Sequence, residues 1–189
     1  MPQARTLSPR ELRRVLDHVA TRRHAARNRL MILMTHWAGM RVGEVAALRL
    51  GDVVSRDGGV RSEIRLAAEQ TKGRHARVVF VSERLRREIT AYVGKLDASD
   101  ALLPLFATQK RGGFSANTLC GTLNGIYRQA GLDGASSHSG RRSFITALAG
   151  KGISVRVLAA LAGHRSLSSI LPYIDASDDM KRQAVELIG

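Results

Sequence analysis

The most restrictive feature of the sequence is a segment from Ala26 to Ala38 that is apolar on almost all sides. A helix with that pattern has to be covered by other elements around its whole circumference. Gly39 follows the segment and can take the left-handed conformation that commonly ends a helix. The sequence therefore predicts a buried helix over 26–38 at the centre of the fold. Its longest apolar run, 30–34, is far shorter than the roughly 18 residues of a membrane span, so we expect no membrane association.

Helix-start signals precede several other apolar patterns. Ser8-Pro9-Arg10-Glu11 combines a capping box with a proline at the first helical position. Ser82 and Ser115 stand at N-cap positions before apolar residues at helical spacing. We expect a helix after each signal, a short helix over 41–48, and a helical C-terminal third that is broken at 150–152, at Gly163 and around Pro172.

A period-two pattern replaces the helical one after position 60. Ile64 and Leu66 alternate with polar residues in one segment, as Val79 and Val81 do in another. The turn between the segments carries Lys72, which we expect at the tip of a hairpin. The predicted fold is mainly α with a small antiparallel β-sheet, in the α+β class. A hydrophobic content of 44% over 189 residues suffices for one buried core, so we expect a single domain over 1–189.

The charge balance points to a polyanionic partner. The chain carries 30 Lys and Arg against 16 Asp and Glu, a formal net charge of +14. Most of these cations are arginine, the side chain best suited to bidentate phosphate recognition. No segment joins a basic face to an aromatic and apolar one, as membrane-surface helices do. Double-stranded DNA is therefore the predicted partner.

The cysteine content and the N-terminal residues indicate the compartment. The single Cys120 excludes an internal disulfide and a cysteine-based zinc site, which agrees with a reducing environment. Residues 1–5 lack the apolar stretch of a signal peptide. We therefore predict a cytoplasmic protein that uses no metal and no cofactor.

Four short segments carry a family resemblance. They are Gly39 to Glu44, Thr71-Lys72-Gly73, His138-Ser139-Gly140-Arg141, and Ala162-Gly163-His164 followed by Tyr173. Together and in this order they resemble the tyrosine recombinases, the phage-integrase-like family of site-specific DNA recombinases. The resemblance covers nearly the whole chain and includes the spacing of nine residues, 173 − 164, between the last histidine and the tyrosine. It implies the fold of that family's catalytic domain, without the N-terminal domain that clamps DNA from the other side, because residues 1–30 are too few to form one.

The resemblance also implies how the DNA phosphate is attacked. Tyr173 is the expected nucleophile, and its phenol has to lose a proton as it attacks. Arg41 and Arg141 would stabilise the charge that develops on the non-bridging phosphate oxygens. His138 is expected to accept the proton, and His164 to donate a hydrogen bond to the phosphate.

The remaining roles concern the leaving group and the orientation of the arginine. Lys72 matches the family lysine that reaches into the minor groove and protonates the departing 5′ oxygen. Glu44 follows Arg41 by three residues, so on a helix it shares a face with that guanidinium and could fix its orientation. The other histidines are interpreted as structural, and the other tyrosines as core residues: His18, His24, His36 and His75, and Tyr92 and Tyr127.

Two positions depart from the family pattern. Gly140 stands where leucine is usual, which removes an apolar anchor and predicts a weaker placement of Arg141. Pro172 precedes Tyr173, removes a backbone N–H and restricts Leu171, so the tyrosine either begins a helix or lies on a loop.

The preferred hypothesis is a site-specific recombinase for DNA integration or rearrangement that works through a 3′-phosphotyrosyl intermediate. The alternatives are a DNA-binding relative that has lost cleavage and an enzyme similar to type IB topoisomerases. The sequence leaves open the target site and the choice between integration, excision and inversion. The chain is either an excised catalytic domain or a naturally short member, like the fimbrial phase-switch recombinases, which it resembles through the segment 24–28.

The tail over 176–189 is acidic in a basic protein, and its apolar residues recur at helical spacing. We predict an amphipathic helix whose apolar stripe is buried, either on its own domain or on a neighbouring protomer. Of the two, docking on a neighbour within a DNA-bound tetramer is the working hypothesis, with a monomer in the absence of DNA.

Overall fold

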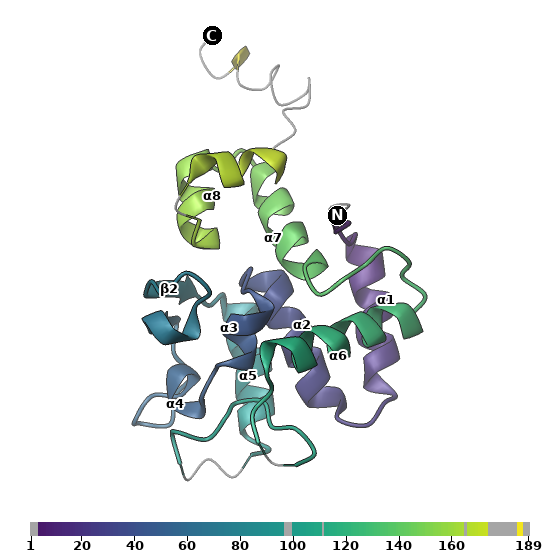
Figure 1. Ribbon diagram of the computed structural model, residues 1–189, viewed down its shortest axis with the longest axis vertical. Helices are drawn as coiled ribbons and strands as arrows, with labels where there is room; N and C mark the ends of the chain where they lie inside the picture. The colour runs from purple at the N-terminus through teal and green to yellow at the C-terminus, as the bar shows by residue number, and fades with distance from the viewer. Residues whose placement is uncertain (1–3, 97–99, 111, 165, 174–184, 187–189) are drawn as a thin grey trace.

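The central helix predicted from the apolar segment is α2 (Ala25–Trp37), and its residues 30–35 are all buried. The computed structural model describes residues 4–96, 100–110, 112–164, 166–173 and 185–186. Helices α1 (Pro9–Ala20), α5 (Glu83–Val93) and α7 (Ser139–Ala149) pack against α2 (Figure 1). The prediction of a buried helix at the centre is confirmed.

The predicted caps form as the sequence indicates. Ser8 accepts a hydrogen bond from the backbone of Glu11, whose carboxylate accepts the backbone N–H of Ser8 at 2.9 Å. The side chain of Ser82 caps α5, and that of Ser115 caps α6 (Ala116–Gln129). Tyr92 and Tyr127 are both buried in the core, as predicted.

The small sheet has two antiparallel strands, β1 (Glu63–Leu66) and β2 (Arg77–Phe80), in which Ile64 pairs with Val79. The connection between them holds a 3₁₀ turn, η1 (Ala68–Gln70), and Lys72. The short helix predicted over 41–48 is α3 (Val42–Ala46), which is shorter because Arg41 is its N-cap residue and Ala47 its C-cap residue. A second short helix, α4 (Leu50–Val53), was not predicted.

The C-terminal part forms a second, smaller core between α7 and α8 (Val155–Ala162). Figure 1 shows α8 above α3 and β2. Gly163 is the C-cap residue of α8, where the sequence predicts a break, and its φ of 61° is left-handed. Two 3₁₀ turns follow, η2 (Leu167–Ser169) and η3 (Leu171–Tyr173), so Tyr173 ends a short turn. Of the predicted tail over 176–189 only 185–186 are described, and its docking stays a prediction.

Gly140 allows the close contact between α7 and α2. A Cβ atom on Gly140 would lie 2.2 Å from Oγ1 of Thr35 and 3.3 Å from the backbone nitrogen of His36. Thr35 is completely buried, and its Oγ1 donates a hydrogen bond to the carbonyl oxygen of Ile32 at 2.8 Å, which holds the side chain in place. The expectation that this glycine weakens the placement of Arg141 is therefore wrong, because the missing side chain lets the two helices meet and buries the arginine next to it.

Replacing Gly140 by alanine will lower stability. The new Cβ would overlap Thr35, and overpacking of this kind costs about 1–3 kcal/mol. Gly121→Ala is the matched control, since Gly121 lies inside α6 with no atom within 4 Å of a Cβ, and it should be neutral or stabilising by up to about 1 kcal/mol. Urea unfolding measures both variants. Equal stability of Gly140→Ala and the unmodified protein would contradict the close contact.

Candidate active site

Arg141 lies in the first turn of α7 and is held by the ends of two helices. It is 7% exposed. Its Nη1 donates to the carbonyl oxygen of Gly39 at 2.6 Å, and its Nη2 to that of Ala162 at 2.5 Å. Gly39 follows α2 and Ala162 ends α8, where carbonyl groups lack partners within the helix and carry partial negative charge. Burial, together with the positive charge of Arg41, lowers the pKa of Arg141 to about 9, so it stays protonated at neutral pH.

Glu44 is the anion of the site, and its side chain is 1% exposed. Arg41 donates its backbone N–H to Oε2 at 2.7 Å and its Nη1 to Oε1 at 3.0 Å. Arg77 donates Nε to Oε1 at 3.0 Å and Nη2 to Oε2 at 2.6 Å. Burial raises the pKa of Glu44, but the hydrogen bonds and charges of the two arginines outweigh it and hold that pKa below its usual value. Glu44 is therefore ionised and shared by two guanidinium groups.

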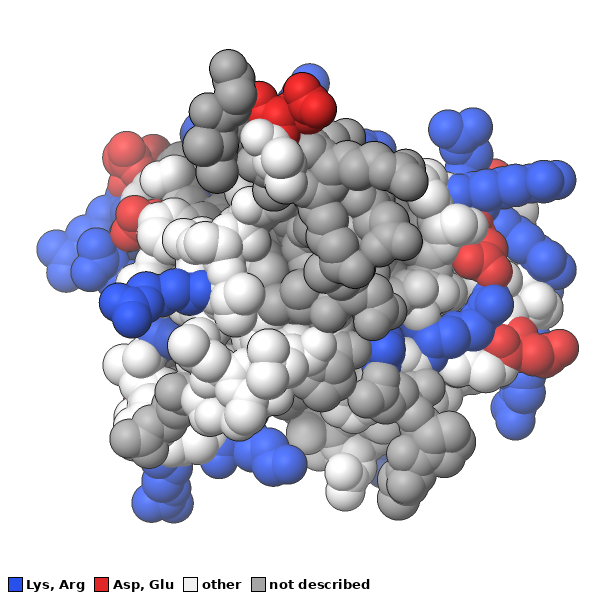
Figure 2. Space-filling model, turned by 90° about the horizontal axis from the view of Figure 1, so that it is seen from above, with Lys and Arg blue, Asp and Glu red and all other residues white. Residues whose placement is uncertain are grey.

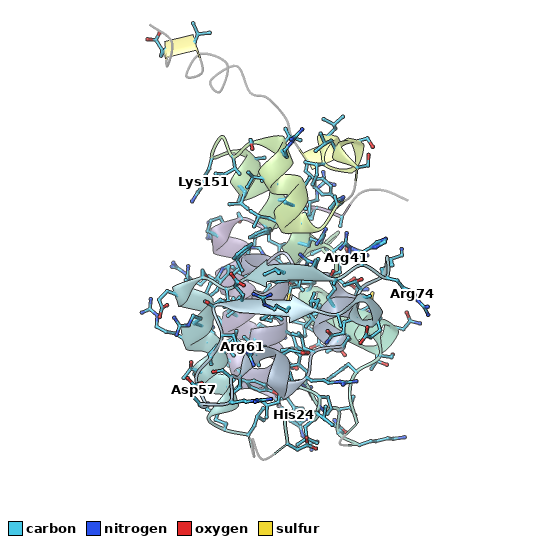
Figure 3. All side chains as sticks on the ribbon, turned by 90° about the vertical axis from the view of Figure 1, so that its left-hand side faces the viewer. His24, Arg41, Asp57, Arg61, Arg74 and Lys151 are labelled. Carbon is cyan, nitrogen blue, oxygen red and sulfur yellow. The ribbon has the colours of Figure 1, made fainter. Side chains whose placement is uncertain are left out.

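The end of α8 also binds these two arginines. Nη2 of Arg41 donates to the carbonyl oxygen of Gly163, and Nη1 of Arg77 to that of Leu161, both at 3.0 Å. Side chains from α7, from the start of α3 and from β2 therefore meet at one helix terminus. Figure 3 shows Arg41 at the junction between the strands and the C-terminal helices.

A hollow of about 570 Å³ opens beside this junction. His164 lies on its wall, immediately after α8. Burial and the charges of Arg141, Arg41 and Arg77 lower the pKa of His164 to about 4. The imidazole is therefore neutral at pH 7 and has one N–H to donate. The hollow is lined by Arg41, Thr71, Lys72, Gly73, His75, Ala76, Arg77, Gly163, His164 and Ser166.

Tyr173 lies next to His164. The two ring centroids are 6.4 Å apart, and the rings meet edge to face at 75°. Cζ of Arg142 lies 5.2 Å from the centroid of the tyrosine ring, within the range of a cation–π contact. The ring also packs against the smaller core. These contacts hold the tyrosine ring on the side of the hollow that carries His164.

Residues 5–180 match the Phage integrase family. The chain belongs to this family. It is 30% identical over 187 residues to the tyrosine recombinase XerA of Thermococcus kodakarensis. This match covers 98% of the chain and 62% of that protein. It is 27% identical over 192 residues to transposase A from transposon Tn554 of Staphylococcus aureus, covering 96% of the chain and 52% of that protein. The chain thus spans roughly half to three fifths of the length of these curated relatives.

Solved structures share the fold. The crystal structure of XerA recombinase matches with a TM-score of 0.76 at 22% identity, over 99% of this chain and 65% of that one. The structure of the Tn1549 transposon integrase with circular intermediate DNA also matches with a TM-score of 0.76. The sequence identity is 16%, and the match covers 100% of this chain and 68% of that one. These matches confirm the predicted fold, a mainly helical phage-integrase catalytic domain with a small antiparallel sheet.

The predicted site residues are only partly brought together. Arg41, Lys72 and His164 line the hollow, Arg141 is held behind it, and Tyr173 touches His164. His138 does not line the hollow: it is exposed and stands at the N-cap of α7. Among the described residues, no cluster of His, Cys, Asp or Glu could hold a metal ion, and no helix is both long and apolar enough to span a bilayer.

Two arginines at the site had no role in the sequence interpretation. Arg77 pairs with Glu44 across 33 residues, and Arg142 packs on the ring of Tyr173. His75, interpreted as structural, lines the hollow. A strand arginine at an inward position of β2 was a usable signal for Arg77, because such a residue requires a buried anion as partner.

The depressed pKa of His164 predicts a stability change with pH. The folded-state pKa is about 4 against an ordinary value of 6.5, so between these values the unfolded chain binds more protons. The contribution of His164 to the free energy of unfolding is therefore fully present above about pH 6.5 and is lost as the pH falls toward 4. His164→Gln removes this contribution, and its free energy of unfolding should fall less between pH 7 and pH 5 than that of the unmodified protein. His36, with a pKa also lowered to about 4 by burial, contributes equally to both proteins. Identical pH dependence in the two proteins would refute the assignment.

Proposed function

We propose that the chain is the catalytic domain of a site-specific DNA recombinase that cleaves and rejoins DNA through a 3′-phosphotyrosyl intermediate. The observation that carries the proposal is the group of arginines beside a hollow that Lys72 and neutral His164 line, with the ring of Tyr173 next to that of His164. Membership of the phage integrase family supports it. The reaction is a transesterification that conserves the phosphodiester bond energy, so it requires no ATP.

In this mechanism the phenol oxygen of Tyr173 attacks the phosphorus atom. A bond forms from this oxygen to phosphorus while the bond from phosphorus to the 5′ oxygen breaks. The phenol proton passes to His138, and Lys72 gives a proton to the departing 5′ oxygen, which leaves as a hydroxyl. A DNA-bound arrangement has to bring His138 to the phosphate, since it does not line the hollow in the free protein.

The cations act on the phosphate oxygens. Arg41 and Arg141 would stabilise the charge that grows on them in the transition state, and His164 would donate a hydrogen bond to one of them. The positions of these groups are fixed by helix-end carbonyls and by Glu44 before any substrate binds. Preorganised donors of this kind need no rearrangement during the reaction, and each is worth about 10²-fold to 10³-fold in rate.

Double-stranded DNA is the proposed substrate and partner, and the cytoplasm the proposed compartment. The net charge of +14 supports DNA as the substrate. Figure 2 shows Lys and Arg side chains projecting round the edge of the face that carries the C-terminal helices, with fewer Asp and Glu among them. Two similar proteins have structures in complex with DNA, the Tn1549 integrase and XerH recombinase. Specific strand exchange also requires paired sites, for which we propose a tetramer on DNA and a monomer without it.

A suicide substrate tests the chemistry. Duplex DNA nicked near the target site, incubated with the protein in EDTA, should give a covalent complex that is stable in denaturant. Tyr173→Phe should abolish it, because only the nucleophilic hydroxyl is removed and the ring contacts remain. Arg141→Lys should slow its formation by about 10²-fold to 10³-fold.

The alternatives give different results in the same assay. A covalent complex that survives Tyr173→Phe would refute the assignment of the nucleophile. Salt-sensitive binding with no complex on any DNA would identify a DNA-binding relative that has lost cleavage. Relaxation of supercoiled plasmid without sequence preference would favour the topoisomerase-like reaction.

The tail tests the proposed assembly. Deleting residues 176–189 should leave binding to a single half-site nearly unchanged and lower the cooperativity of binding to paired half-sites, because the apolar stripe that docks on the neighbour is lost. Gel-shift titrations on single and paired half-sites measure both quantities. Unchanged cooperativity would show that the tail does not dock in trans.

A further inference from the structure

We propose that Arg77 is a positioning residue that neutralises Glu44 and so leaves the charge of Arg41 available to a phosphate in the hollow. The inference deepens the proposed function and rests on it for the identity of the anion. It comes from the unequal way in which the two arginines bind one carboxylate.

Arg77 binds Glu44 in the stronger geometry. Its Nε and Nη2 lie opposite the two carboxylate oxygens at 3.0 and 2.6 Å, which is the parallel fork of a bidentate pair. The side chain of Arg77 is only 9% exposed. The pair is therefore largely shielded from water, where a charge-assisted bond is strongest.

Arg41 binds the same carboxylate in a different way. One of its two bonds comes from the backbone N–H, and only Nη1 of the guanidinium reaches Glu44, at 3.0 Å. Its side chain is 29% exposed and lines the hollow. Nη2 is fixed by the carbonyl of Gly163, and a guanidinium has more N–H groups than these two bonds use. Arg41 therefore keeps donors and charge for a ligand.

The charges explain why a second arginine is needed. Glu44 carries one negative charge and can neutralise one guanidinium. Without Arg77, Arg41 would be the nearest cation to a carboxylate that is 1% exposed. Because a buried anion without a partner is costly, Arg41 would be drawn into a full bidentate pair with Glu44. In that position Arg41 would be electrostatically neutralised and turned away from the hollow.

Arg77 also fixes the wall of the hollow. Its Nη1 bonds to Leu161, and its side chain packs so closely on Gly163 that a Cβ there would lie 2.6 Å from Cδ of Arg77. His164 follows directly. If Arg77 acted only through these structural contacts, the Glu44→Gln change would not compensate for the loss of Arg77.

A double-mutant cycle separates the two roles. Arg77→Gln should slow covalent-complex formation on the suicide substrate by about 10²-fold, with half-site affinity changed less than about threefold. In the Glu44→Gln background, where no anion competes for Arg41, the same Arg77→Gln change should cost less than about tenfold. Arg65→Gln is the matched control. Arg65 lies in β1, the strand paired with β2, and forms an ion pair with Glu63 of the same strand, but it is 81% exposed. This change should leave the rate unchanged.

Other measurements keep the outcome decisive. Thermal unfolding verifies that each variant is folded, and Arg77→Met, which removes the charge but keeps a long side chain, replaces Arg77→Gln in the cycle if the latter does not fold. Phosphate binding is measured by titrating inorganic phosphate while the His164 resonance is followed by NMR. Phosphate should bind more weakly to the Arg77 variant than to the unmodified protein, and its affinity should recover when Glu44→Gln is added to that variant.

The outcomes distinguish the inference from the proposed function. Equal costs of the Arg77 change in both backgrounds would show a structural role and overturn the inference. If the unmodified protein forms no covalent complex but phosphate binding follows the predicted pattern, the proposed function is wrong and the role of Arg77 stands. If it neither cleaves DNA nor binds phosphate, both are wrong.

Discussion

Guanidinium groups repel one another, and the fold brings Arg41, Arg77 and Arg141 together by giving each a carbonyl oxygen at the C-terminal end of α8. The partial negative charge of a helix C-terminus offsets part of the repulsion, and Glu44 offsets one full charge. These arginines and Glu44 still sum to 3 − 1 = +2 beside neutral His164. The unbalanced charge favours an anion in the hollow, so the contacts that hold the smaller core to the rest of the molecule also make the hollow electropositive.

Close backbone approaches make these contacts possible. The carbonyls that bind Arg141 and Arg41 include those of Gly39 and Gly163, each with a φ of 61°. A Cβ on Gly39 would lie 2.4 Å from Cδ1 of Phe144, so only glycine fits that position. Gly140 acts in the same way between α7 and α2. The geometry of the site therefore depends on these glycines as much as on the arginines.

Local patterns predicted the elements, and long-range contacts supplied what the patterns missed. The capping box at Ser8, the apolar α2 and the alternation of the strands act within a few residues, and they appear as expected. The pairing of Arg77 with Glu44 spans 33 residues, and nothing in either local segment specifies its partner. The contact of Gly140 with Thr35 reversed an expectation for the same reason, because a helix-propensity cost says nothing about the helix opposite. His138 was placed in the site by motif order alone, and it does not line the hollow.

The proposed catalytic residues differ in how much they also contribute to the stability of the fold. Removing the guanidinium of Arg141 would leave the carbonyls of Gly39 and Ala162 without this donor in a buried place, at a cost of about 1–3 kcal/mol for each unsatisfied group. Lys72 is exposed and contributes little to packing. Under the proposed mechanism, a loss of activity on changing Arg141 would therefore combine lost transition-state stabilisation with lost structure, whereas a change at Lys72 would act on the reaction alone.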